Sequence, residues 1–77
     1  MPTRAFILVE TQVGRANQVV QALRSLPGVQ SADVVTGSFD VIARIEVDSM
    51  GAMADLVTGQ MQGIRGVLRT ITCVVAG

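Results

Sequence analysis

The chain has 77 residues, 49% of them hydrophobic, and its six arginines and six acidic residues balance to a net charge of +0. A domain of this length buries only about 60% of the surface that its unfolded chain exposes, so we expect other copies of the chain to cover part of the apolar surface. The scattered arginines and the lack of Trp and Tyr argue against direct nucleic-acid binding, which needs clustered cations and stacking rings.

The first part of the sequence predicts a strand and then a helix. Residues 4–10 are rich in Phe, Ile, Leu and Val, which is typical of a strand. Over residues 14–26 the apolar positions change to the spacing of an amphipathic helix. Pro27-Gly28 ends that helix, because proline disfavours helical geometry in the residue before it and glycine allows the chain to leave.

The second part predicts two strands, a helix and a closing strand. Residues 29–36 and 39–47 have the composition of strands. Asp48-Ser49 provides good N-caps for a helix that ends near Gly63. Residues 67–76 form the last strand.

The order β-α-β-β-α-β predicts an α+β fold, the ferredoxin-like sandwich, in which two helices cover one face of a four-stranded antiparallel sheet. Strand alternation sends Ala5, Ile7 and Val9 toward the helices and leaves Phe6 and Leu8 on the other face. We expect this bare, partly apolar face to support dimerisation.

Groups that carry common chemistry are scarce. The sequence has no His and no Cys/His cluster, so we expect no metal, no cofactor and no enzymatic activity. Cys73 is the only cysteine, which rules out a disulfide within the chain and favours a cytoplasmic location. In an apolar strand it is expected to behave as a small hydrophobe. No apolar run approaches the roughly 20 residues of a membrane helix, and the first residues lack the pattern of a secretory signal.

The junction between the two middle strands has two interpretations. Residues 34–46, VVTGSFDVIARIE, place Thr36-Gly37-Ser38 between two apolar runs. On physical grounds alone this is the bend of a hairpin, where Gly37 supplies a positive φ and Asp40 caps the amides of its own loop. The same residues can also hold a ligand.

The residue order of the junction favours the second interpretation. TGSFD at residues 36–40 resembles the "tG-x-Y/F-D" signature in the effector-binding domain of the Lrp/AsnC (feast/famine) transcription regulators. SLPGV at residues 25–29 is similar to the "lpgV" step of that family. GIRGVLRTIT at residues 63–72 is similar to its closing "l-x-GV-x-x-t-x-T" strand. The resemblance covers nearly the whole chain.

The resemblance implies an architecture and a function. Residues 1–77 would be a single, stand-alone RAM (regulation of amino-acid metabolism) domain without the helix-turn-helix domain of full-length members. It would be a non-catalytic sensor that dimerises through its sheet and assembles dimers into a ring of about eight or ten chains. A free amino acid would bind between dimers, and a full-length Lrp/AsnC regulator is a further possible partner.

The resemblance also implies which residues contact the ligand. Asp40 would accept hydrogen bonds from the ligand's ammonium, while backbone amides at Gly37 and Ser38 would donate to its carboxylate. Threonine hydroxyls on the closing strand would complete the hydrogen bonds, and Phe39, Val34 and Met50 would wall in the ligand's side chain. Threonine is common on strands for β-propensity alone, and Phe39 lies on the apolar face of its predicted strand, where it can equally be core. The ligand-binding set is Thr36, Gly37, Ser38, Phe39, Asp40, Met50, Thr70 and Thr72.

Three other functions stay open at this point. A ligand-free oligomerisation module would keep the apolar interfaces but would not need Asp40 or paired threonines. A small dimeric ferredoxin-like enzyme generally relies on His, Trp, Tyr or Asn in a pocket, and the only aromatic residues here are Phe6 and Phe39. The ACT domain, another amino-acid sensor, has the same element order, but the TGSFD junction points away from it.

Overall fold

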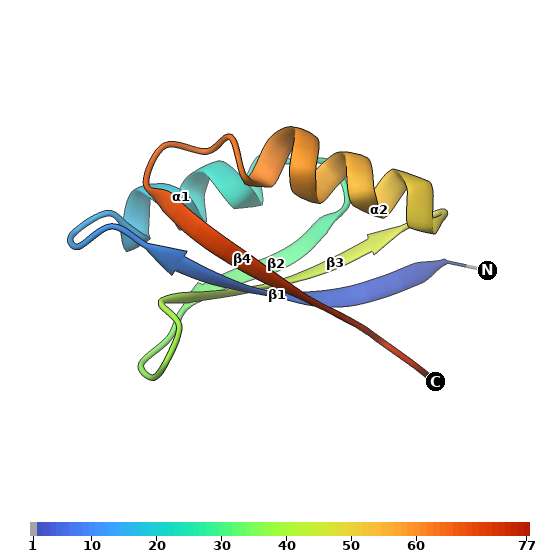
Figure 1. The fold of residues 1–77 in the computed structure, drawn as a ribbon, viewed down its shortest axis with the longest axis horizontal. Helices are drawn as coiled ribbons and strands as arrows, with labels where there is room; N and C mark the ends of the chain where they lie inside the picture. Colours follow the sequence, from blue (N-terminus) through green and yellow to red (C-terminus); the bar gives the residue numbers. More distant parts are fainter. Residues whose placement is uncertain (1) are drawn as a thin grey trace.

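The secondary-structure elements follow the predicted order. The protein is described here by a computed structural model, which covers residues 2–77 (Figure 1). The elements are β1 (Thr3–Thr11), α1 (Ala16–Arg24), β2 (Val29–Val34), β3 (Val41–Val47), α2 (Met50–Leu56), a π-helical turn η1 (Val57–Met61) and β4 (Val67–Val74). Each predicted strand and helix is therefore present, with ends that shift by a few residues.

The four strands form one antiparallel sheet in the order β2-β3-β1-β4. Both helices lie on the same side of this sheet, and no element among residues 2–77 covers the other side (Figure 1). The predicted α+β sandwich is confirmed. Because β2 and β4 are the edge strands, each leaves one row of backbone groups for solvent or for another chain.

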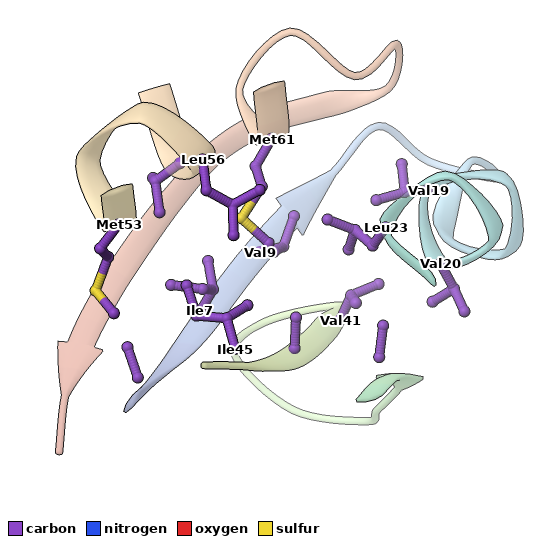
Figure 2. Packing of buried hydrophobic residues seen from close by; sticks show 14 residues of the cluster. Ile7, Val9, Val19, Val20, Leu23, Val41, Ile45, Met53, Leu56 and Met61 are labelled. Carbon is purple, nitrogen blue, oxygen red and sulfur yellow. The ribbon is translucent and has the colours of Figure 1, made fainter. Parts of the chain in front are cut away.

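The core lies between the sheet and the helices. Alternate residues of β1 and β3 are fully buried, and Figure 2 shows side chains from both helices directed at them. Burying one large aliphatic side chain contributes roughly 1.5–3 kcal/mol, so this layer provides most of the stability of one chain. The largest members are Ile7, Val9, Val19, Leu23, Val41, Ile45, Met53 and Met61.

The second helix begins as predicted but changes pitch before it ends. The Ser49 hydroxyl accepts a hydrogen bond from the Ala52 amide at 3.0 Å, so Ser49 is the N-cap. After Leu56 the helix widens into the π turn, in which the amide of Gln62 donates to the carbonyl of Val57 at 3.0 Å. Met61, at the end of this turn, is fully buried.

The two middle strands are shorter than predicted, and a six-residue loop joins them. β2 ends at Val34 and β3 begins at Val41. The amide of Val35 donates to the carbonyl of Asp40 at 2.9 Å and closes residues 35–40, which we call the hairpin loop. Figure 1 shows this loop projecting to the side of the sheet away from the helices.

Phe39 is not part of the core, which corrects one of the two placements predicted for it. It precedes β3, is half-buried and lies outside the buried cluster beneath the helices. The prediction failed because it extended the alternation of β3 backward, whereas the strand begins only at Val41.

Across residues 2–77, no helix has both the length and the apolar character needed to cross a membrane.

Candidate ligand-binding site

The tip of the hairpin loop presents unpaired backbone amides. Thr36, Gly37 and Ser38 are all exposed. In the part of the chain that the structure describes, the amides of Gly37 and Ser38 donate to no other group. Gly37 has φ 153°, and a Cβ built there would meet nothing within 4 Å, so its surroundings leave space for an approaching molecule.

Asp40 fixes the hairpin loop to the end of β1. Its carboxylate oxygen Oδ2 accepts a hydrogen bond from the Thr11 amide at 2.8 Å, and its own amide donates to the Val9 carbonyl at 3.0 Å. The pairing of β1 with β4 shifts register between Glu10 and Thr11, and the Asp40 carboxylate bonds to the amide at this irregularity. Thr11 is only 7% exposed, so its amide needs such a partner.

This geometry corrects the prediction that Asp40 caps the amides of its own loop. Its carboxylate instead reaches a strand that lies 29 residues earlier in the sequence. The second oxygen, Oδ1, has no hydrogen-bond partner within residues 2–77 and remains able to accept from a cation.

Phe39 lies under an arginine on the bare side of the sheet. The Arg69 guanidinium carbon is 5.5 Å from the centre of the Phe39 ring, which is the geometry of a cation–π contact. The Nε of Arg69 is also 3.6 Å from Oε2 of Glu10, its neighbour across the strands. The two contacts connect the hairpin loop with β1 and β4.

The two threonines of the candidate site lie on the opposite face of the sheet. Thr70 pairs with Val9 and Thr72 pairs with Ile7, whose side chains are buried beneath the helices. Directly paired residues of antiparallel strands share a face. Thr70 is half-buried and Thr72 is exposed, so the helices leave this part of the β4 edge open.

Met50 lies at the end of the sheet away from the hairpin loop. It is the first residue of α2 and is 57% exposed. It lies beyond the C-terminal end of β3, whereas the hairpin loop precedes the N-terminal end of that strand. A shallow groove joins it to both ends of the chain, with lining residues Pro2, Thr3, Arg4, Met50 and Val74 to Gly77.

One chain therefore does not bring the eight predicted residues together. The hairpin loop lies on the bare side of the sheet, and the threonines lie on the helix side of an edge strand. Met50 lies at the end of the sheet away from the hairpin loop. A compact ligand can contact the hairpin loop together with the threonines or Met50 only where a second chain contributes part of the site.

Sequence reasoning missed one polar residue beside the threonines. Gln62 follows the π turn, and its side-chain Nε2 donates to the hydroxyl of Thr70 at 3.2 Å. No local sequence pattern marks this contact, because it depends on the widened helical turn and on the return path of β4.

Cysteine and acidic side chains form no metal site in the described chain. Residues 2–77 contain no group of three His, Cys, Asp or Glu side chains placed to hold an ion. Cys73 pairs with Phe6 and is exposed, so it lies on the bare face and not in a core. The prediction that it behaves as a small hydrophobe would require another surface to cover it.

Comparison with known families identifies the domain. The model of the Lrp/AsnC ligand binding domain matches residues 4–76, nearly the whole chain. The chain belongs to this family. The resemblance that the TGSFD junction and the closing strand predicted is confirmed.

Relatives of this Lrp/AsnC domain include transcriptional regulators. An uncharacterized HTH-type transcriptional regulator of Pyrococcus abyssi (strain GE5 / Orsay) is 29% identical over 70 residues, which cover 91% of this chain and 44% of the regulator. The chain thus spans about half the length, or less, of the curated relatives it matches.

Solved structures of similar shape agree with the family assignment. The crystal structure of TTHA0845 from Thermus thermophilus is 28% identical with a TM-score of 0.93, over 97% of this chain and 94% of that one. The transcriptional regulator NMB0573 from Neisseria meningitidis, crystallised as a complex with L-Met, is 23% identical with a TM-score of 0.87. That match covers 97% of this chain and 50% of the regulator, and at this identity it shows the fold alone.

Proposed function

We propose that this Lrp/AsnC domain is a non-catalytic sensor that binds a free amino acid in a site completed by a second copy of the chain. The observation that carries the proposal is the composition of the hairpin loop. Gly37 and Ser38, whose amides are unpaired, precede Asp40 by three and two residues in the sequence. Asp40 has one carboxylate oxygen, Oδ1, that is free. The loop thus offers donors for a carboxylate and an acceptor for an ammonium, the two groups that every free amino acid carries close together.

The threonine face of β4 provides the second part of the proposed site. Thr70 and Thr72 point away from the hairpin loop of their own chain, so in this proposal they belong to a site that the loop of another copy completes. Phe39 and Met50 would contribute apolar contacts to the ligand's side chain. The complex of NMB0573 with L-Met supports an amino acid as the class of ligand.

The proposed signal is a change in assembly. A ligand that contacts two copies binds more tightly to the assembled form, and it shifts the equilibrium only by that difference in affinity. In this proposal, dimers formed through the sheet assemble into a ring of about eight or ten chains. In this proposal the ligand affects transcription through the state of the assembly or through a full-length Lrp/AsnC regulator that associates with it.

The first test is a ligand screen by thermal unfolding. The purified protein is heated with each of the twenty amino acids at millimolar concentration, while light scattering follows the oligomer size. A ligand at one hundred times its dissociation constant adds about 2.7 kcal/mol per site, which raises Tm by several degrees in a small domain. We expect a selective increase in Tm with one amino acid or a small group of them.

The matched variant is Asp40→Asn. It keeps an oxygen that can accept from the Thr11 amide but removes the negative charge proposed to hold the ammonium. We expect its Tm without ligand to stay near that of the parent, and the ligand-induced shift to disappear. Asp33→Asn removes an exposed carboxylate on β2 and is the control that keeps the shift. An Asp40→Asn protein that responds as the parent does would contradict the site, and a flat response from a stable oligomer would leave an assembly module without a ligand.

A further inference from the structure

Gln62 extends from the helical layer to the open edge of the sheet. It immediately follows η1, and the π turn brings its amide to the carbonyl five residues earlier while Met61 stays buried. π turns of this kind are frequent at functional sites. The Gln62 side chain forms a hydrogen bond with Thr70 at 3.2 Å and is exposed.

The hydrogen bond between Gln62 and Thr70 fixes which polar atoms remain available. Gln62 donates through Nε2, and no described residue among 2–77 bonds to its carbonyl oxygen Oε1. The Thr70 hydroxyl accepts this bond, so its own proton remains available for donation. One acceptor and one donor thus lie side by side at the edge of β4. They complement a carboxamide, which has N–H donors on its nitrogen and an acceptor oxygen beside them.

We infer that Gln62 is a specificity-determining residue, and that it favours amino acids whose side chain ends in a carboxamide. The ligand's amide nitrogen donates to Oε1 of Gln62, and the ligand's amide oxygen accepts from the Thr70 hydroxyl. Where a second copy covers this edge and excludes water, an aliphatic side chain of the same size leaves both groups without a partner. This inference rests on the proposed amino-acid site and names the part of it that reads the ligand's side chain.

Pairs of ligands of similar shape provide the test. Titration calorimetry on the full chain compares L-asparagine with L-leucine and L-glutamine with L-methionine. One net hydrogen bond at a partly exposed site corresponds to about tenfold in affinity, so we expect the parent protein to prefer each amide by at least that factor. In Gln62→Met, which keeps the length of the side chain without its amide, the preference falls to near one. Gln60→Met changes an exposed glutamine within η1 and keeps the parent's preference.

The outcomes separate this inference from the proposed function. Binding of amino acids with no amide preference in the parent, or with a preference that Gln62→Met leaves intact, overturns the role of Gln62 and leaves the sensor standing. Failure to bind any amino acid overturns both. If Gln62→Met does not fold, Gln62→Glu replaces it. That variant keeps the acceptor and loses the donor to Thr70, so we expect a partial loss of the preference.

Discussion

The bond between Asp40 and Thr11 predicts a measurable contribution to stability. Asp40→Ala removes the acceptor for the Thr11 amide, which lies at an irregular position of β1 where only 7% of the residue is exposed. A buried donor left without a partner costs roughly 1–3 kcal/mol. We therefore expect Asp40→Ala to lower the free energy of unfolding by about that amount in urea denaturation.

Asp40→Asn separates the hydrogen bond from the charge. The asparagine side-chain oxygen can still accept from the Thr11 amide. We therefore expect Asp40→Asn to be more stable than Asp40→Ala and nearly as stable as the parent. If the alanine variant were as stable as the parent, the carboxylate would contribute nothing to holding the hairpin loop, and the short distance would be incidental.

Asp40 also illustrates what a sequence can and cannot predict about a site. Local turn chemistry predicted a cap for the residue's own loop, and the family resemblance predicted a ligand contact. Neither could identify Thr11 as the partner, because the need for an acceptor there arises from a register shift between β1 and β4. Gln62 was missed for a related reason, since its contact with Thr70 depends on the three-dimensional path of two elements.

The helices and strands were easier to predict than their ends. Apolar periodicity and composition were sufficient for the order of the elements and the sheet face of β1, and residue type was sufficient for the N-cap at Ser49. Burial and capping are local consequences of sequence. Each of the two strand ends at the hairpin loop was wrong by two residues. There the carbonyl and amide groups bond across the loop and to β1, an arrangement that β-propensity does not encode.

The connection between η1 and β4 predicts a sensitive glycine. Gly66 has φ +101°, and a Cβ built there would lie 3.0 Å from Cβ of Arg15 and 3.2 Å from Cγ2 of Val19. Gly66→Ala therefore combines backbone strain with crowding against α1. We expect it to lower the free energy of unfolding by roughly 1–3 kcal/mol in urea denaturation.

A second glycine provides the matched control for Gly66. Gly59 lies within η1, and a Cβ there would meet nothing within 4 Å. Because alanine is the better helix former, we expect Gly59→Ala to be neutral or to stabilise by up to about 1 kcal/mol. Equal stability changes for the two variants would contradict the assignment of strain to Gly66.

The bare face of the sheet has the composition of an interface between copies of the chain. Phe6 is 44% exposed and Ile71 is 37% exposed, and half-buried Leu8 and Ile42 share their face. Charged pairs flank these apolar residues, as in the Glu10–Arg69 ion pair. A monomer would leave this surface in water, and a sheet packed against its two-fold mate would bury it.

Phe6→Arg tests whether this face holds the proposed assembly together. Phe6 pairs with Arg44 across β1 and β3, so the new arginine adds a second positive charge at the centre of the face. We expect the variant to stay folded, because Phe6 lies outside the core, and to sediment as a much smaller species than the parent in analytical ultracentrifugation. Val13→Arg places the same charge on the fully exposed β1–α1 connection and should leave the assembly unchanged. Phe6→Arg chains that retain the parent's mass would show that the copies meet elsewhere, and the ligand site between them would then have to be built from other surfaces.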